Sequence, residues 1–467
     1  MSERWTQVKK LTSVDAFREH CAALGIEIPI ADEVDPTGSL ARSVEIAGTS
    51  LTACNRFAVL PMEGWDATTD GRPTDLVRRR WSRFATSGCG LVWGEATAVR
   101  LDGRANPHQL VIDESTVDAI AELRSLLAPE QVAGLQLTHS GRWSRPGAMP
   151  APRTAYPHPI LDARVGTDEA AVFSDDELDA LVQDYVDAAV LAQQAGFDFV
   201  DVKHCHGYLL HELLTGHDRQ GRYGGDLAGR TEFLRAVVTG VRERAPGLAI
   251  AVRLSAFDLV PFRPGDGGVG VPESTGPYRF AFGGDGTGLG IDLTETHAFL
   301  DRCEEWGIGL VSTTAGSPYY NPHIQRPAYF PPSDGYQPPE DPLCGVARQL
   351  AVTASLTQAH PSLTIIGSGY SYLQDWLAHV AQAVVDDGGA AMVGLGRMIL
   401  SYPGLAADAL AGRPVDTRSI CRTFSDCTTA PRNGLVSGCY PLDEFYKTHP
   451  DRAVLTQAKK DAKARLR

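Results

Sequence analysis

Residues 196–225 read GFDFVDVKHCHGYLLHELLTGHDRQGRYGG and join a strand pattern to a dense group of reactive side chains. The largely apolar run over residues 197–202 has the length of a buried strand. Lys203, His206 and Tyr208 follow it and bring a cation, proton donors and proton acceptors to the end of that strand. Parallel α/β barrels place their active sites at the carboxyl ends of their strands. The stretch therefore predicts an active site on a barrel of this kind.

Apolar runs of strand length recur along the chain and alternate with helical patterns. Besides residues 199–202, they are Phe57–Leu60, Leu91–Trp93, Val132–Leu137, Ala249–Leu254, Gly309–Ser312, Leu363–Ile366 and Ala391–Val393. Strands that are apolar throughout are buried on both faces, as in a parallel sheet covered by helices. Eight such units in one domain favour an α/β fold of the closed (β/α)8 TIM-barrel type over an open doubly wound sheet.

The clearest helix signal directly precedes the opening stretch. Ser174 and Glu177 have the spacing of a capping box, and an apolar face at helical spacing follows. Gly196 stands where the helix would end in a left-handed conformation. We therefore expect a helix that leads straight into the strand at residues 199–202.

Segments of different composition flank the barrel or interrupt it. The expected parts are an N-terminal extension (1–45) with a helix at Val14–Leu24, the barrel (46–410) with long loops near 140–170 and 258–290, and a C-terminal tail (411–467) packed on the barrel. Loops of such length commonly act as lids or binding loops, or are disordered. Residues 284–288 (GDGTG) follow no strand and lack the spacing of a nucleotide-binding motif, so we interpret them as a flexible loop.

Composition excludes several classes of protein. The 467 residues include 43 Lys and Arg against 57 Asp and Glu, a net charge of −14, which argues against a nucleic-acid partner. No stretch approaches the roughly 18 apolar residues of a membrane span, and residues 1–10 lack a signal peptide's apolar core. Nine scattered cysteines, an odd number, favour the reducing cytoplasm over a disulfide scaffold. We expect a cytoplasmic protein with a small-molecule substrate, and homo-oligomerisation is left open.

Several motifs stand in the same order as in a known family and cover about residues 50–440. They are Asn55–Phe57 with Pro61 and Met62, Gly94–Val99, Gln136–Arg142, residues 203–208 with Arg222–Gly225 and Arg230, Val252–Ser255, Gly367–Gly369 and Gly394–Arg397. In these motifs the chain resembles the Old Yellow Enzyme or NADH:flavin oxidoreductase family of FMN-binding barrels. The resemblance implies FMN as cofactor and NADPH or NADH as co-substrate.

Two glycine-containing turns follow the seventh and eighth strands and predict a phosphate site. Gly367, Ser368 and Gly369 form the first turn, and Gly396 and Arg397 end the second. Backbone N–H groups converge on an anion at this place in such barrels, and an arginine adds a bidentate cation. The alternative is a pair of ordinary tight turns.

Two residues near strand ends are expected to meet the flavin ring. Arg253 closes a buried strand and needs an anion, because an unpaired buried guanidinium is costly. Gln136 offers a donor and an acceptor to the pyrimidine edge. The alternatives are a structural ion pair for Arg253 and a core amide for Gln136. The resemblance also assigns Pro61, Met62 and Ala96 to the cofactor site.

The resemblance implies catalytic roles for three residues. In the family, two polar residues hold the oxygen of an electron-withdrawing group, and a tyrosine protonates the α-carbon. His206 and Tyr208 match the second polar position and the tyrosine, whereas Lys203 departs from the family's usual histidine. Its ammonium could hold an enolate oxygen, donate a proton or pair with an acid, or it could reach to the barrel rim. His204 and Cys205 match no functional position of the family.

Glu63 is a second departure, because the family often has Thr or Cys at this position near the flavin. An ionised carboxylate cannot donate a hydrogen bond to the ring. Either Glu63 pairs with Lys203, or the turn shifts so that Gly64 takes its place. We nevertheless count Glu63 among the cofactor-site residues.

Three cysteines near the C-terminus raise the question of an iron–sulfur cluster. Larger relatives carry a [4Fe–4S] cluster on four cysteines. Cys427 and Cys439 match the last two of these positions. The first two positions are occupied by Ile420 and Thr423, and Cys421 is one residue out of register. A cluster needs its thiolates, so we expect no cluster and no metal. A zinc site would lack a spacing signature. We also expect no pyridine-nucleotide domain after the tail, so that electrons come from soluble NAD(P)H or a partner.

The favoured function is an FMN-dependent oxidoreductase that reduces an activated C=C bond of an enone or enal with NAD(P)H by a ping-pong mechanism. One alternative is an FMN-dependent dehydrogenase or oxidase-type tailoring enzyme that acts on an amine or a natural product. Another is a non-catalytic flavin-binding scaffold.

Overall fold

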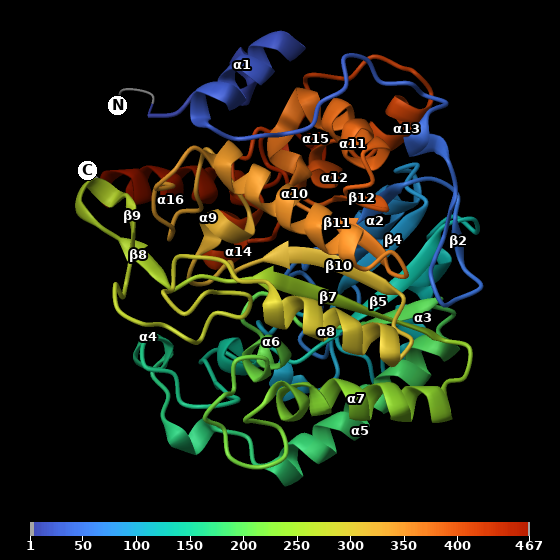
Figure 1. The fold of residues 1–467 in the computed structure, drawn as a ribbon, viewed down its shortest axis with the longest axis vertical. Helices are drawn as coiled ribbons and strands as arrows, with labels where there is room; N and C mark the ends of the chain where they lie inside the picture. Colours follow the sequence, from blue (N-terminus) through green and yellow to red (C-terminus); the bar gives the residue numbers. More distant parts are fainter. Residues whose placement is uncertain (1–3, 466–467) are drawn as a thin grey trace.

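The computed structural model describes residues 4–465, which fold around one closed barrel (Figure 1). Its strands are β3 (Phe57–Val59), β4 (Leu91–Ala98), β5 (Val132–Thr138), β6 (Phe199–Val202), β7 (Ala249–Phe257), β10 (Leu310–Ala315), β11 (Thr364–Gly367) and β12 (Met392–Leu395). All eight neighbouring pairs are parallel and follow chain order, and β12 closes on β3. The predicted (β/α)8 barrel is confirmed, with strand ends that differ from the predictions by a few residues.

Helices surround the barrel and are joined to its strands by loops of unequal length. They are α1 (Val14–Leu24), α2 (Asp75–Ala85), α3 (Val117–Ser125), α4 (Leu161–Val165), α5 (Asp175–Gln194), α6 (Leu209–Leu213), α7 (Leu227–Arg244), α8 (Thr294–Glu305), α9 (Pro322–Gln325), α10 (Pro342–Ala359), α11 (Leu377–Asp386), α12 (Arg397–Ser401), α13 (Leu405–Leu410), α14 (Asp426–Arg432), α15 (Glu444–Lys447) and α16 (Asp451–Arg465). None of the helices in the described chain is both long and apolar enough to cross a membrane.

Helix α5 shows how the local sequence sets up the strand that follows. The capping box of Ser174 and Glu177 is present, and the helix buries one face against α7 and the barrel. Gly196 then takes a φ of +84°, which glycine adopts without steric cost. The chain enters β6, whose four residues are all buried. The predicted passage from helix to strand is confirmed.

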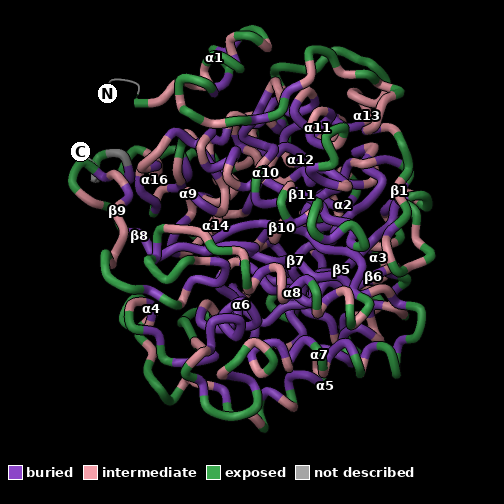
Figure 2. The backbone as a smooth tube through the Cα atoms, viewed as in Figure 1, coloured by how far each residue is buried: buried purple, intermediate pink, exposed green. Residues whose placement is uncertain are grey.

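Burial is concentrated in two layers, inside the barrel and between its strands and helices (Figure 2). The interior layer includes Trp93 and Phe199, whose rings meet edge to face at 5.0 Å. A short hairpin of β1 (Val44–Glu45) and β2 (Thr52–Ala53) lies at the amino ends of the strands, where Ala47 N–H donates to Thr364. The opposite end, at the carboxyl ends of the strands, is left for the site.

The segments outside the barrel pack against it. The ring of Phe17 on α1 lies 6.3 Å from that of Trp376, and the loop at 258–290 contains a hairpin of β8 (Phe262–Pro264) and β9 (Gly270–Pro272). Helices α14 and α16 of the C-terminal tail lie near α9 (Figure 1). Arg432 of α14 donates to the carbonyl of Pro318 at 2.8 Å, so the tail reaches the face that carries the site.

Candidate active site

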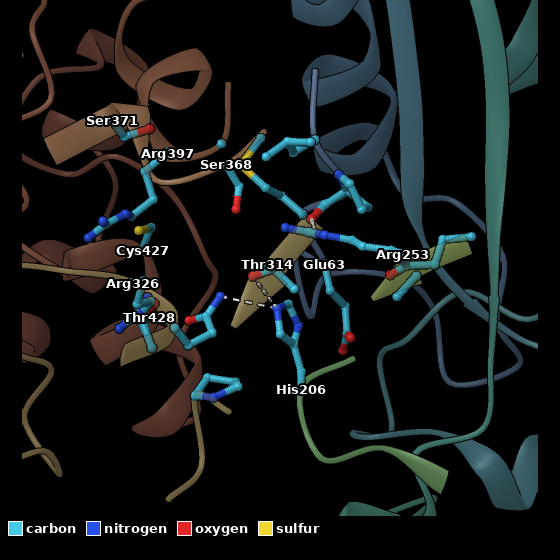
Figure 3. A pocket seen from close by; sticks show the side chains of 18 of the residues that line it. Glu63, His206, Arg253, Thr314, Arg326, Ser368, Ser371, Arg397, Cys427 and Thr428 are labelled. Carbon is cyan, nitrogen blue, oxygen red and sulfur yellow. Dashed lines mark hydrogen bonds between the residues drawn. The ribbon is translucent and has the colours of Figure 1, made fainter. Parts of the chain in front are cut away.

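A cavity of about 250 Å³ opens at the carboxyl ends of the barrel strands (Figure 3). The predicted site residues that line it are Pro61, Met62, Glu63, Ala96, Gln136, Lys203, His206, Tyr208, Arg253, Ser368, Gly369, Gly396 and Arg397. Gly367, the last residue of β11, does not line the cavity and directly precedes Ser368, which does. The fold therefore brings together side chains that lie hundreds of positions apart in the sequence.

A buried carboxylate, Asp201 of β6, organises one end of the cavity. It accepts hydrogen bonds from the Gln136 amide at 2.6 Å, the Trp93 indole at 2.8 Å and the backbone N–H of Arg253 at 2.7 Å. Burial raises the pKa of Asp201 to about 6, against the effect of these donors. Asp201 was not among the predicted site residues, although an acidic residue in an otherwise apolar strand is a signal of a buried polar network.

Arg253 projects from β7 into the same end of the cavity. Its Nη1 donates to the carbonyl of Pro61 at 3.3 Å, while its Nε is buried with no hydrogen-bond partner among the described residues. No carboxylate of the described chain forms an ion pair with it; Asp201 accepts from its backbone instead. Burial lowers the pKa of Arg253. The guanidinium thus retains an open donor and an uncompensated charge.

Lys203 and two tyrosines form the wall beside Arg253. The Lys203 ammonium lies 3.8 Å from the centroid of the Tyr208 ring, so Lys203 does not reach to the barrel rim. The hydroxyls of Tyr208 and Tyr319 are 2.9 Å apart, and Tyr319 stacks on Trp143 at 4.3 Å and 7°. Burial lowers the pKa of Lys203 and raises that of Tyr208. Tyr208 is therefore protonated and held in one position.

Glu63 follows β3 and lines the cavity, whereas Gly64 faces a smaller cavity next to it. The Glu63 carboxylate accepts a hydrogen bond from the side chain of Asn106. Burial raises the pKa of Glu63 to about 7, and the charge of Lys203 opposes this rise. Glu63 and not Gly64 is thus the cavity residue, and its carboxyl group is within the field of Lys203.

The backbone of His206 is held in an unusual conformation. Its φ is +67°, in the left-handed region that non-glycine residues rarely adopt. The Ser255 hydroxyl accepts from its N–H at 3.0 Å, and the Ser317 hydroxyl donates to its carbonyl at 2.7 Å. Such a conformation persists only where its surroundings enforce it, and here it turns the imidazole into the cavity (Figure 3).

The ring of His206 is neutral. Burial lowers the pKa of His206 well below its ordinary value, and the positive charges of Arg253 and Lys203 lower it further. The side-chain amide of Gln325 lies 3.3 Å from Nε2, and a neutral imidazole carries one N–H. Thr314 lies 3.4 Å from the same nitrogen. The imidazole can therefore offer one neutral N–H donor to a ligand.

His204 and Cys205, between these residues, face away from the chemistry. His204 Nδ1 is 2.7 Å from the carbonyl of Val202, and burial lowers its pKa to about 4. Cys205 is fully buried, which raises the pKa of its thiol to about 11. Both side chains serve packing.

The predicted phosphate turns lie at the other end of the cavity. Gly369 has a φ of +97°, and a Cβ on Gly394 would lie 2.6 Å from the carbonyl oxygen of Gly367, so both positions require glycine. Arg397 Nη2 donates to the carbonyl of Pro327 at 2.8 Å, and its Nη1 is buried without a partner in the described chain. This end thus combines close-approaching backbone with an open cationic donor.

Many cavity residues were not predicted from the sequence. They are Trp65, Thr314, Pro318, Tyr319, Gln325, Arg326, Pro327, Ser371, Cys427, Thr428, Pro431, Arg432 and Ser437, together with Leu60 and Leu400. Most of them come from the loop after β10 and from the C-terminal tail. Neither segment shows a periodic pattern or a motif, and their place depends on tertiary packing.

The cysteines of the tail lie close to the cavity. Cys427 lines it, Cys439 lines the smaller neighbouring cavity, and Cys421 is buried. All nine cysteines of the chain are free thiols. The expected lack of a cluster and of a metal stays a prediction.

The open donors of the cavity fit an FMN molecule. Buried arginine nitrogens without partners in residues 4–465 occur at both ends, at Arg253 and at Arg397 (Figure 3). Reduced flavin carries negative charge on its ring, and FMN carries a phosphate at its other end. Arg253 and Gln136 would hold the ring, and Arg397 with the turn at Ser368 would hold the phosphate. The arrangement defines an FMN-dependent oxidoreductase.

Comparison with known proteins agrees with this class. Residues 45–267 match the model of the NADH:flavin oxidoreductase / NADH oxidase family. It is similar to NADPH dehydrogenase of Geobacillus thermodenitrificans (strain NG80-2), with 28% identity over 359 residues, 76% of this chain and 88% of that one. The predicted resemblance to this family, the enzyme class and the cofactor are confirmed.

Solved structures share the fold at lower identity. A 2-naphthoyl-CoA reductase complex superposes with a TM-score of 0.68 at 18% identity, covering 90% of this chain and 58% of that chain. Morphinone reductase superposes with a TM-score of 0.56 at 21% identity, covering 81% of this chain and 91% of that chain. This chain thus spans 58% of the 2-naphthoyl-CoA reductase chain. At these identities, the similarity to both structures concerns the fold alone.

Proposed function

We propose that the protein reduces an activated C=C bond, conjugated to an electron-withdrawing oxygen, with NADPH or NADH as the source of electrons. The observation that carries this proposal is the protonated Tyr208 hydroxyl, held 2.9 Å from Tyr319 in a cavity that also holds Lys203 and a neutral His206. When bound, FMN supplies the hydride for the β-carbon of the alkene, after it has been reduced by the nicotinamide nucleotide.

Lys203 and His206 bind the substrate oxygen and stabilise the charge that develops on it. The ammonium of Lys203 and the ring N–H of His206 are donors on largely buried side chains, where such donors are most effective. Both are already in place before the reaction, since one lies on an aromatic face and the other is fixed by its backbone. The negative charge that develops on the substrate oxygen is therefore stabilised without reorganisation of these two side chains.

Tyr208 gives its proton to the α-carbon, which completes the addition of two hydrogens across the double bond. The phenolate left behind is stabilised by the Lys203 ammonium against its ring and by the Tyr319 hydroxyl. Tyr319 then returns a proton to Tyr208, and solvent reprotonates Tyr319. Trp143 holds the Tyr319 ring in position for this transfer.

Anaerobic mixing of the FMN-loaded protein with NADPH or NADH, and then with 2-cyclohexenone or another activated alkene, tests the proposal. We expect the flavin absorbance to bleach with the nucleotide and to return with the alkene. A flavin that bleaches but is reoxidised by no activated alkene contradicts the proposal. Bleaching by an amine without any nucleotide would favour the dehydrogenase alternative instead.

Tyr208→Phe separates the two halves of the reaction. The variant should slow alkene-dependent reoxidation by about 10²–10⁴-fold, because a general acid contributes on this order. Bleaching by NADPH should stay within about threefold of the wild type, because Tyr208 has no role in it. Tyr319→Phe is the matched control for the relay and should slow reoxidation by about tenfold, the value of one hydrogen bond of about 1.4 kcal/mol. An unchanged reoxidation rate in Tyr208→Phe would remove the tyrosine from the mechanism.

A further inference from the structure

A second arginine, Arg326, lies at the phosphate end of the cavity beside Arg397. It directly follows α9, and its Nη1 donates to the hydroxyl of Thr428 on α14. Its Nε and Nη2 are buried and have no hydrogen-bond partner within residues 4–465. No carboxylate of that part of the chain forms an ion pair with Arg326. The part of the side chain that is not covered by protein faces the cavity.

Arg326 and Arg397 repel one another. Burial lowers the pKa of Arg326 to about 9, and the charge of Arg397 is the next largest cause. Both guanidinium groups lie on the same side of the cavity, opposite Arg253 (Figure 3). Two adjacent buried cations without counter-charges are unfavourable, so this end of the cavity is suited to an anion of more than one charge.

A third arginine nearby, Arg432, differs in being compensated. It also lines the cavity, but its Nη1 forms an ion pair with Asp334 at 2.5 Å and its Nη2 donates to Pro318 O at 2.8 Å. Its hydrogen bonds and its charge are satisfied within the protein. The open charge at this end is therefore that of Arg326 and Arg397 alone.

We infer that Arg326 and Arg397 together bind the phosphate dianion of FMN, and that Thr428 of the C-terminal tail positions Arg326 for this. Both arginines line the cavity, and three of their nitrogens, Nε and Nη2 of Arg326 and Nη1 of Arg397, are buried without a partner in the described chain. A phosphate offers three terminal oxygens as acceptors. The backbone turn at Ser368 and Gly369 lines the same cavity. Residues 45–267, which match the family, include neither Arg326 nor Thr428, so this contact belongs to the later part of the chain.

The inference extends the cofactor site and is independent of the proposed alkene reduction. It concerns the affinity of the apoprotein for flavin, and no substrate enters into it. A protein that binds FMN through Arg326 and reduces no alkene would retain this inference and lose the proposed function.

The test compares FMN with riboflavin, which has the same ring and lacks the phosphate. The apoprotein is titrated with each flavin, and binding is followed by quenching of flavin fluorescence. Arg326→Gln should weaken FMN binding by about 10–100-fold, the value of hydrogen bonds to a charged group, and should leave riboflavin binding within about threefold. Thr428→Val should weaken FMN binding by about 3–10-fold, because it removes only the positioning contact.

Arg432→Gln is the matched control, since it removes a cation from the same cavity that is already compensated by Asp334. It should change the ratio of FMN to riboflavin affinity by less than about threefold. Arg326→Lys retains the charge without the planar fork and should recover only part of the FMN affinity. Thermal unfolding of each apoprotein variant checks that it is folded.

Two outcomes overturn the inference. Equal weakening of FMN and riboflavin in Arg326→Gln would show that Arg326 supports the fold of the cavity and does not contact the phosphate. Unchanged binding of both flavins, together with a raised KM for NADPH, would assign the arginine to the phosphates of the hydride donor.

Discussion

Two regions of this molecule bury an arginine, one with carboxylate partners and one without them. In the smaller cavity beside the site, Arg80 of α2 donates to Asp66 at 2.6 and 2.9 Å and to Glu95 at 3.0 Å. The Trp81 indole also donates to Glu95 at 2.8 Å. These charges raise the pKa of Arg80 despite its burial. In the cavity, Arg253 has no such partner, and burial lowers its pKa.

The difference separates a structural ion pair from a ligand site. A buried cation that the protein compensates is part of the fold, and removal of one partner leaves the other charge unpaired. A buried cation that the protein leaves open raises the free energy of the apoprotein, and a bound anion recovers that energy. The same residue type therefore has opposite effects on stability in the two regions.

Arg80→Met should have the largest effect on stability. It leaves Asp66 and Glu95 buried close to one another without their cation, which costs about 3–5 kcal/mol in the free energy of unfolding. Urea unfolding of the apoprotein, followed by tryptophan fluorescence, measures it. A loss below about 1 kcal/mol, the range of an exposed pair, would show that the cluster is not structural.

Arg253→Met should act in the opposite direction. The apoprotein should be unchanged or up to about 2 kcal/mol more stable, because an uncompensated buried charge is replaced by an apolar side chain of similar length. The FMN-loaded protein should gain less or lose stability, since the contact to the flavin is removed. Unfolding of apoprotein and loaded protein in parallel gives both values. An apoprotein loss as large as that of Arg80→Met would make Arg253 a structural ion-pair residue.

The cavity also divides into a part that could be predicted from sequence and a part that could not. Lys203 and Ser368 directly follow β6 and β11, and Arg253 lies within β7, which continues to Phe257, beyond its predicted end. A parallel barrel must bring such side chains together near the carboxyl ends of its strands. Eight apolar runs were enough to locate those ends. The barrel therefore followed from periodicity and order, whereas the roles of these residues followed from the family resemblance.

Tyr319, Arg326 and Thr428 belong to the other part. They lie in the loop after β10 and in the C-terminal tail, and their place depends on contacts such as that of Arg326 with Thr428, 102 positions apart. No local pattern specifies such a contact. Asp201 is an intermediate case, since its strand was predicted and its polar role was not. The missed residues are those placed by packing between distant segments.

Glu63 lies between the two regions and gives the smallest effect. Burial raises its pKa from 4.5 to about 7, although part of the side chain is exposed to the cavity. Between about pH 4.5 and 7 the folded chain keeps a proton on Glu63 that the unfolded chain has lost, so this contribution to stability is full below pH 4.5 and falls as the pH rises toward 7. Glu63→Gln removes the dependence on pH. Its stability relative to the wild type should rise by about 1 kcal/mol from pH 5 to pH 7, roughly half of the about 2 kcal/mol that the full pKa shift would give, because solvent in the cavity screens the partly exposed carboxyl group. Asp201 and Asp258, whose pKa values are raised to about 6 by burial, contribute with the same sign in both proteins and cancel in the difference. Urea unfolding of both apoproteins at pH 5 and pH 7 measures this difference in stability. A difference that does not change with pH would mean that the charge of Lys203 fully compensates the Glu63 carboxylate. Glu63 would then belong with the paired charges around Arg80.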